Sequence, residues 1–222
     1  MCDTVTPWEH GSVLRTPSCP NFWDANTVRV EAAGVDAATM HAAADAALAD
    51  CRHRKLDVED EATGKAARPF FAERGWMNER LAMMRRTGPP PPVLHDVEEV
   101  PLAETRALRT EWYSDELGDH EGFAAAQDPI LARRGMRAFV VRDAGFATLA
   151  VGPGAAEIDG LYVTPSARGR GIGASLVAAA LAAGGRDVAW IVADDEGQAR
   201  ALYERLGFAT VWRPYNFVRT PS

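Results

Sequence analysis

Several kinds of residue and segment are scarce in this sequence, and each scarcity argues against a class of protein. Lysine occurs only at Lys55 and Lys65, so arginine supplies almost all of the positive charge. Acidic residues outnumber lysine and arginine by 31 to 24, which gives a net charge of −7. Nucleic-acid binding usually requires a basic face, so we expect no nucleic-acid partner. An acidic surface is compatible with a cationic amine as substrate.

Long apolar runs and paired cysteines are also missing. No apolar run reaches the length of about 18 residues that a membrane span needs, so we expect no membrane partner. The first residues, Met1-Cys2-Asp3-Thr4, have neither the basic region nor the apolar core of a signal peptide. Three cysteines without a C-x-x-C pair favour a cytoplasmic protein with reduced thiols. The scattered histidines do not have the spacing of a zinc site, so we expect no metal.

What the sequence does contain is a proline-rich segment that divides it. Gly88 is followed by four prolines, Pro89 to Pro92, which form a stiff and extended stretch. We therefore predict an N-terminal half at residues 1–88, a linker at 89–92 and a second domain at 93–222. Both parts lie within the usual size range of a domain.

The two halves share a pattern near their ends. A strand, an acidic turn, a helix and then a glycine with an aromatic residue end at Gly75-Trp76 in the first half and at Gly207-Phe208 in the second. We interpret this pattern as an internal duplication. In the second half the residue pattern predicts helices at 102–112, 172–183 and 198–206, and strands at 137–142, 145–151, 157–163, 187–193 and 211–218. The order βββαβαβ predicts a mixed sheet with helices.

A glycine-rich loop is the most informative feature of the chain. The residues Arg168-Gly169-Arg170-Gly171-Ile172-Gly173 lie between a predicted strand and an alanine-rich helix. Glycines allow a ligand to approach the backbone closely. The first amides of the following helix lack partners within it, and the helix dipole adds positive potential. The loop therefore predicts a phosphate or pyrophosphate site.

This loop resembles the acetyl-CoA signature Arg/Gln-x-x-Gly-x-Gly/Ala of the GNAT superfamily of N-acetyltransferases. The segment from Ala199 to Phe208, with Leu202, Tyr203 and Gly207, is similar to the late helix of that superfamily. The resemblance covers roughly residues 93–219. It implies a GNAT-like α+β fold, with a mostly antiparallel mixed sheet flanked by helices. The first half is then a degenerate, tandem GNAT-like half, because its corresponding region near Val30 to Ala38 contains Gly34 but no alternating glycines.

A dinucleotide-binding fingerprint is the main competitor for the same residues. The spacing Gly169-x-Gly171-x-x-Ala174 satisfies its relaxed form. However, residues 164–168 separate the predicted strand from the first glycine, and two hairpin-like strands precede the motif. Both features favour the GNAT interpretation.

The GNAT resemblance implies how acetyl-CoA is bound. Backbone amides of the loop would hold the pyrophosphate, from residues Arg168, Gly169, Arg170, Gly171, Ile172, Gly173 and Ala174. The preceding strand, with Leu161, Tyr162 and Val163, would bond the pantetheine arm, and the amide of Leu161 would polarise the thioester carbonyl. Asp194 and Asp195 would cap the following helix, contact CoA or line the amine site, and we favour capping.

The resemblance also implies candidate catalytic residues. Tyr203 would protonate the departing CoA sulfur, although helical spacing is equally compatible with a core tyrosine. The corresponding position in the first half is Phe71, which cannot donate a proton. Glu157 is the candidate general base and Asp159 the alternative, or either is a plain surface carboxylate. Period-two alternation predicts that Glu157, Asp159 and Leu161 share one face of the strand.

We therefore predict an N-acetyltransferase that moves an acetyl group from acetyl-CoA to a small-molecule or peptide amine. The amine would attack directly in a ternary complex, without a metal or a covalent enzyme intermediate. A non-catalytic acyl-CoA-binding or regulatory module and a transferase for a larger acyl group are the alternatives. We expect a monomer that resembles a dimer internally, or a homodimer.

Overall fold

The computed structural model describes residues 2–20, 22–117 and 123–220. The chain forms two compact units. The first unit comprises Met1–Met83, Ala193–Arg200 and Thr210–Ser222, and the second comprises Met84–Val192 and Ala201–Ala209. We predicted a division at residues 89–92. That division stays a prediction. The last strand, β12 (Tyr215–Arg219), pairs with two strands of the N-terminal region and so belongs to the first compact unit.

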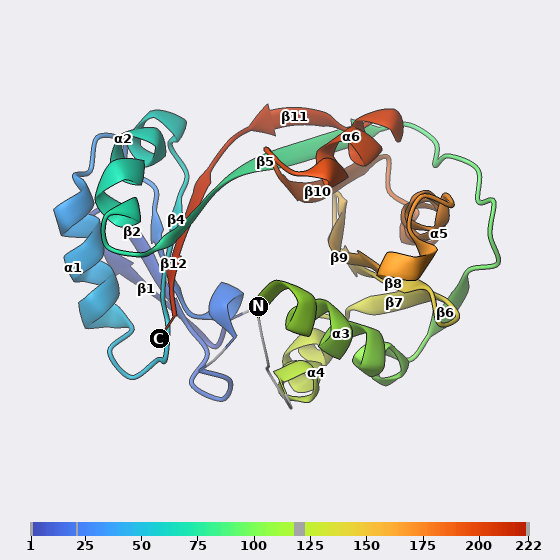
Figure 1. The fold of residues 1–222 in the computed structure, drawn as a ribbon, viewed down its shortest axis with the longest axis horizontal. Helices are drawn as coiled ribbons and strands as arrows, with labels where there is room; N and C mark the ends of the chain where they lie inside the picture. Colours follow the sequence, from blue (N-terminus) through green and yellow to red (C-terminus); the bar gives the residue numbers. More distant parts are fainter. Residues whose placement is uncertain (1, 21, 118–122, 221–222) are drawn as a thin grey trace. The chain divides into compact units, whose positions relative to one another are not determined.

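The first unit contains a mixed sheet with two helices. Its strands follow the order β1-β2-β3-β4-β12-β5, and all neighbouring pairs are antiparallel except β3 and β4. Figure 1 shows α1 (Ala37–Ala47) and α2 (Glu61–Ala72) together beside this sheet. The strand bounds are β1 Thr4–Trp8, β2 Gly11–Arg15, β3 Thr27–Val30, β4 Arg54–Val58 and β5 Met77–Thr87, and a short 3-10 turn covers Trp23–Ala25.

Alternating burial along the strands explains why the helices cover this sheet. Val28 and Val30 on β3 and Leu56 and Val58 on β4 are fully buried. They belong to one apolar cluster with residues of both helices, including Phe71 of α2. A side-chain period of two places such residues on one face of a sheet, which is the face that helices can cover.

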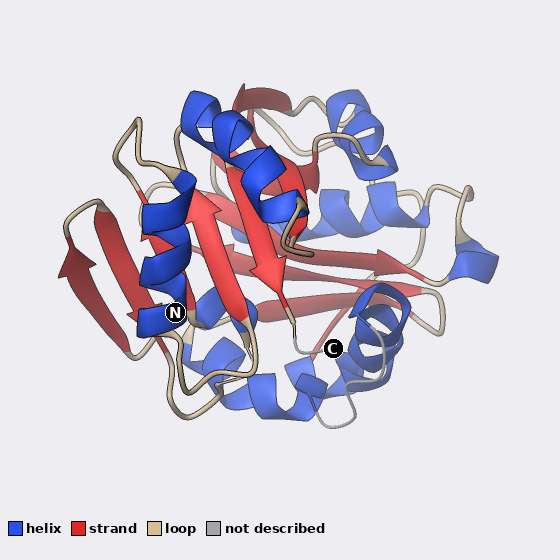
Figure 2. Cartoon of the chain, turned by 60° about the vertical axis from the view of Figure 1, so that its left-hand side comes forward, coloured by secondary structure: helices blue, strands red, loops and turns tan. Residues whose placement is uncertain are grey.

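The second unit is built on a second mixed sheet. Its strands follow the order β10-β9-β8-β7-β6, and only β9 and β10 are parallel. The strands are β6 Glu98–Val100, β7 Arg137–Val141, β8 Gly145–Val151, β9 Ala156–Val163 and β10 Val188–Asp194. The helices are α3 Arg106–Leu117, α4 Phe123–Arg133, α5 Ile172–Gly184 and α6 Gln198–Arg205, with 3-10 turns at Leu102–Thr105 and Pro165–Ala167. Figure 2 distinguishes the helices from the strands by colour.

Helices pack on both faces of this second sheet. A side chain at Gly184 of α5 would meet Leu149 of β8, whereas one at Gly160 of β9 would meet Trp112 of α3. Gly160 pairs with Thr148, the neighbour of Leu149, and neighbouring residues of a strand point to opposite faces. Helix α5 therefore covers one face and α3 the other. The predicted mixed α/β fold is confirmed.

Most predicted elements of the second half are found, with two corrections. The strand predicted at residues 211–218 is two strands, β11 (Ala209–Trp212) and β12, because Pro214 lacks the amide that a continuous strand requires. The helix predicted at 102–112 begins as a 3-10 turn and becomes α3 at Arg106. Across the described residues, no helix is long and apolar enough to span a bilayer.

Candidate active site

The loop before α5 has the backbone conformation of an anion-binding loop. Gly169 and Gly171 have φ angles of 76° and 83°, in the left-handed region that glycine adopts without strain. Gly171 is the N-cap of α5 and no side chain caps the helix there. The Ser175 amide donates to the Gly171 carbonyl at 3.1 Å, which is the first hydrogen bond within the helix. The amides of residues 172–174 therefore have no acceptor inside α5. Such alternating backbone presents successive N–H groups to one anion.

The loop residues are also accessible. Arg168, Gly169, Arg170 and Gly171 are exposed, while Ile172 is buried and anchors the first turn of α5 in the core. The predicted pyrophosphate-binding residues therefore form one continuous surface segment. Their contact with a phosphate stays a prediction.

Strand β9 has an open edge directly before this loop. Its pairing with β10 covers only Ala156 to Ile158. Thr164 donates its amide to Ala144 beside β8 at 2.9 Å, and bond direction alternates along an antiparallel strand. The amides of Leu161 and Val163 therefore point away from β8, toward the open edge, while that of Tyr162 points toward β8. This is the edge where we predicted the pantetheine arm.

The side chain of Arg168 lies along the same edge. Its Nε donates to the carbonyl oxygen of Val163 at 3.0 Å. Its guanidinium carbon lies 5.8 Å from the ring centroid of Tyr162. The open edge is thus partly covered by a flexible, exposed side chain.

A β-bulge changes the face on which Glu157 lies. Leu149 pairs with Ile158 but Thr148 pairs with Gly160, so Asp159 is the extra residue. Ile158 and Leu161 consequently share the α5 face, whereas Glu157 and Gly160 share the opposite face. The predicted common face for Glu157, Asp159 and Leu161 is wrong, because simple alternation fails across the bulge.

The two candidate bases have different surroundings. Glu157 is half-buried and pairs with Ala150 on β8 and Trp190 on β10. Asp159 forms an ion pair with Arg134, with 3.6 Å between Nη1 and Oδ1. Arg134 therefore occupies part of the Asp159 carboxylate. The role of either residue as general base stays a prediction.

Aromatic residues lie on the α3 face, the face that Glu157 shares. The rings of Trp112 and Phe146 lie 5.8 Å apart, and those of Trp112 and Tyr162 lie 6.5 Å apart. The hydroxyl of Tyr162 donates to Glu111 at 3.0 Å. Sequence reasoning missed Glu111 and Trp112 because only the fold brings α3 onto β9.

Tyr203 is buried in α6, close to the loop. It is 5% exposed, and burial raises its pKa to about 12. The neighbouring Leu202 packs at the start of α5, where a side chain at Gly173 would meet it at 3.4 Å and Val163 at 3.6 Å. Leu202 of α6 and Val163 at the end of β9 therefore both lie close to Gly173 in the first turn of α5. The raised pKa keeps the phenol protonated at neutral pH, as a proton donor requires.

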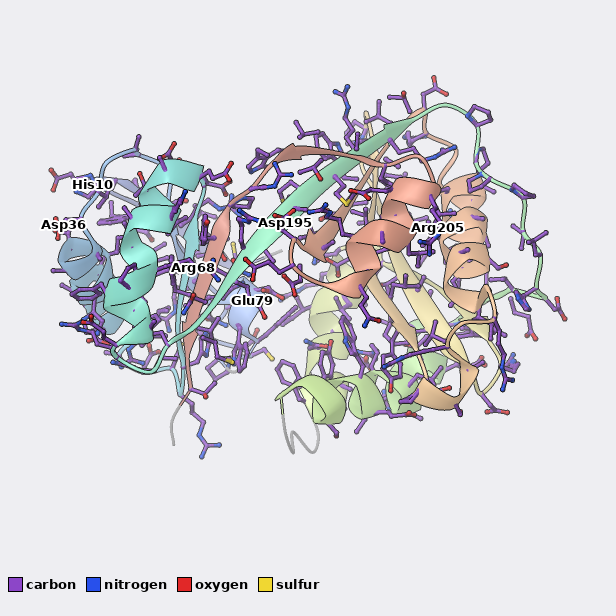
Figure 3. The ribbon with its side chains drawn as sticks, turned by 45° about the horizontal axis from the view of Figure 1, so that its top comes forward. His10, Asp36, Arg68, Glu79, Asp195 and Arg205 are labelled. Carbon is purple, nitrogen blue, oxygen red and sulfur yellow. The ribbon has the colours of Figure 1, made fainter. Side chains whose placement is uncertain are left out.

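Asp195 belongs to the first unit and is enclosed by arginines. Figure 3 labels Asp195. Its side chain is fully buried and lies 2.6 Å from Arg80, 2.9 Å from Arg200 and 3.1 Å from Arg213. Burial alone raises the pKa of Asp195, but hydrogen bonds from Arg200 and Arg213 outweigh this effect and the pKa is lowered. The turn before α6 is instead bonded by Asp194, which accepts from the Glu196 amide. A contact between Asp195 and CoA stays a prediction.

The potential metal ligands and the thiols of the described residues offer no second site. No group of three potential metal ligands occurs among residues 2–20, 22–117 and 123–220. The cysteines are free, and burial raises the pKa of the Cys19 and Cys51 thiols, which makes them poor nucleophiles.

Comparison with known proteins agrees with this geometry. The model of the acetyltransferase (GNAT) family matches residues 102–208. Residues 102–208 are therefore similar to the GNAT acetyltransferase domain. The match includes β9, the glycine loop, α5 and Tyr203, so the predicted resemblance is confirmed. No protein of curated function matches the sequence.

Solved structures share the fold of this chain at low sequence identity. A functionally unknown conserved protein from Staphylococcus epidermidis has a TM-score of 0.78 at 15% identity, covering 100% of this chain and 95% of that chain. A GCN5-related N-acetyltransferase from Kribbella flavida has a TM-score of 0.62 at 18% identity, covering 100% and 90%. A tandem GNAT protein from the clavulanic acid biosynthesis pathway has a TM-score of 0.55 at 17% identity, covering 100% and 86%.

Proposed function

We propose that this protein transfers an acetyl group from acetyl-CoA to the nitrogen of an amine. The observation that carries the proposal is the pair of left-handed glycines, Gly169 and Gly171, before the uncapped end of α5. A diphosphate fits this arrangement, because amides and the helix dipole both favour negative charge there. The match to the GNAT family over residues 102–208 supports acyl-CoA as the source of that diphosphate.

The open edge of β9 would then receive the pantetheine arm. The amides of Leu161 and Val163 point toward this edge, and the Arg168 side chain would leave the Val163 carbonyl as the arm binds. The Leu161 amide would donate to the thioester oxygen. A donor aimed at that oxygen stabilises the charge that develops in the transition state.

Glu157 and Tyr203 would divide the proton transfers between them. The amine lone pair attacks the thioester carbon, and Glu157 takes the proton that nitrogen loses. When the tetrahedral intermediate collapses, the carbon–sulfur bond breaks and Tyr203 gives its proton to the CoA sulfur. Solvent then returns a proton to Tyr203, whose pKa of about 12 favours the phenol. No covalent enzyme intermediate is needed.

A larger acyl group and a non-catalytic role as an acyl-CoA-binding module are the competing functions. Calorimetry with CoA, followed by a screen of amines with acetyl-CoA and longer acyl-CoA donors, tests all three. We expect one CoA bound per chain and transfer from acetyl-CoA to a small-molecule or peptide amine. Tight CoA binding without transfer to any amine would replace this proposal with the binding module. Cytoplasmic location and oligomeric state, monomer or homodimer, stay predictions.

A further inference from the structure

The segment from Gly88 to Val97, which we name the strap, is bonded to the rest of the second unit at its start. It is the long loop between β5 and β6 (Figure 1). Gly88 donates its amide to Asp187 at 3.2 Å, just before β10. Arg86 donates to the Gly88 carbonyl at 3.0 Å and, through Nε, to Leu206 at 2.9 Å. Leu206 follows α6, so Arg86 joins the start of the strap to the end of the Tyr203 helix.

Farther along, the strap contacts the phosphate loop itself. The Leu94 amide donates to Ser175 Oγ at 3.1 Å, and Ser175 is buried in the first turns of α5. His95 Nε2 lies 2.8 Å from the carbonyl oxygen of Arg170. A side chain at Gly171 would lie 3.6 Å from the same imidazole nitrogen. Two hydrogen bonds therefore attach the strap to the segment 170–175, one at Arg170 and one at Ser175.

The hydrogen bond of His95 determines the direction of an amide in the loop. A carbonyl oxygen only accepts, so Nε2 carries the proton and donates it to Arg170. The Arg170 carbonyl and the Gly171 amide belong to one planar trans peptide, in which C=O and N–H point in opposite directions. Holding the carbonyl toward His95 therefore turns the Gly171 N–H to the other side of the loop. A donor on the carbonyl also polarises that N–H and makes it a stronger donor to an anion.

We propose that His95 is a positioning residue for the diphosphate of CoA, acting through the Arg170–Gly171 peptide. The strap thereby completes the cofactor site from outside the glycine motif. Without this bond the two left-handed glycines leave the peptide free to turn its carbonyl toward the phosphates, which repels them. This inference rests on the proposed function, since it assumes that the loop binds a diphosphate.

The test compares His95→Ala with His95→Gln by calorimetry with CoA. Losing one hydrogen bond of ordinary strength should raise the Kd for CoA about 3- to 10-fold. His95→Gln should bind CoA within about twofold of the unchanged protein, because the Gln amide nitrogen can donate to the same carbonyl. His10→Ala is the matched control, since His10 is also half-buried but belongs to the first unit. It should leave the Kd unchanged.

Two further measurements separate this inference from the proposed function. In transfer assays, the KM for S-acetylpantetheine, which lacks the diphosphate, should be equal for His95→Ala and the unchanged protein. Hydrogen exchange of the amides at 169–175 in the CoA-free protein should quicken in His95→Ala and not in His95→Gln. A folded His95→Ala that binds CoA as tightly as the unchanged protein would overturn the inference. If the unchanged protein itself binds no CoA, the proposed function fails, and loop exchange unaffected by His95→Ala would remove the inference independently.

Discussion

The two strand–loop–helix segments of this chain, β3 to α1 and β9 to α5, have the same order but opposite chemistry at the helix start. Asp36, labelled in Figure 3, is the N-cap of α1. Its carboxylate accepts from the Thr39 amide at 3.0 Å and from the Thr39 hydroxyl at 2.6 Å. Helix α5 begins at Gly171, without a side-chain cap. The carboxylate of Asp36 thus occupies the amides at the start of α1, whereas the amides at the start of α5 can bind an external anion.

The loops and strands of the two segments also differ in how far their backbone groups are bonded within the protein. Gly34 of the first loop also has a left-handed φ, of 75°, but its amide is bonded to Thr63 at 2.7 Å. Strands β3 and β4 stay paired to their ends at Val30 and Val58, whereas β9 and β10 are paired only as far as Ile158. The proposed cofactor site therefore depends on backbone amides and a strand edge that the described contacts leave for a ligand. The shared topology alone does not create one.

The largest expected effect comes from giving α5 the cap that α1 has. Gly171→Asp places a carboxylate where the diphosphate is proposed to bind. Two charges about 4 Å apart repel by about 4 kcal/mol at an effective dielectric constant near 20. We expect Gly171→Asp to weaken CoA binding about 100-fold or more, measured by calorimetry.

Gly171→Asn is the matched control for this substitution. Asparagine has nearly the same shape as aspartate and tolerates the left-handed region equally well, but it is neutral. We expect it to bind CoA far better than Gly171→Asp. Equal CoA affinities for the two variants would mean that the uncapped end of α5 is not an anion site.

Tyr203→Phe introduces the residue type that the first half has at the corresponding position, Phe71. It should lower kcat about 100-fold, at the low end of the contribution of general acid catalysis. Phe71, its counterpart, is fully buried and stacks on Phe217 at 4.5 Å, so an aromatic ring suffices for packing. The Kd for CoA should not change, because the hydroxyl is not needed for binding. An unchanged kcat would identify Tyr203 as a core residue only.

The pKa of Tyr203 adds a pH test to the same experiment. Since burial raises the pKa to about 12, the phenol stays protonated well above neutral pH. We expect kcat of the unchanged protein to show no decline between about pH 8 and pH 10 from loss of this proton. A basic limb with a pKa near 8 that disappears in Tyr203→Phe would contradict the burial-based account.

A smaller effect should distinguish the two candidate bases. Glu157→Gln should lower the rate about tenfold near pH 7 and less at higher pH, because a larger share of the amine is then already deprotonated. Asp159→Asn should change it about twofold at most, since the ion pair with Arg134 already occupies that carboxylate. The reverse order of effects, in steady-state assays across pH, would assign the base to Asp159.

The glycine motif and the second-half elements could be predicted because they depend on local patterns. Alternating glycines before an alanine-rich stretch specify a turn and a helix start through backbone preferences alone. Strand β8 has the bounds that alternation predicts. These features need no knowledge of distant contacts.

Three features of the site could not be predicted because they arise from pairing across the chain. The bulge at Asp159 exists only in the register between β8 and β9, and it reverses the face of Glu157 relative to Leu161. The break at Pro214 sends β12 to the first sheet, where it lies between β4 and β5. The contact of His95 with Arg170 joins positions 75 residues apart, which no local pattern reports.

The smallest expected effect comes from removing the cap of α1. Hydrogen bonds from the Thr39 hydroxyl and amide lower the pKa of Asp36, so its carboxylate stabilises the folded protein at pH values above the ordinary pKa. That stabilisation is lost as the pH falls through the folded-state pKa. Asp36→Ala should therefore lower Tm by about 2 °C at pH 7 and by less below about pH 4. Asp36→Asn, which can still accept from the Thr39 amide, should show a smaller change.

The same variant tests whether an uncapped helix is enough to bind CoA. In Asp36→Ala the amide of Gly34 remains bonded to Thr63, and β3 remains paired with β4. We therefore expect the stoichiometry measured by calorimetry to stay at one CoA per chain. A second CoA bound by Asp36→Ala would show that the Asp36 cap alone prevents the first half from binding CoA. In that case the strand edge would matter less than the comparison of the two segments indicates.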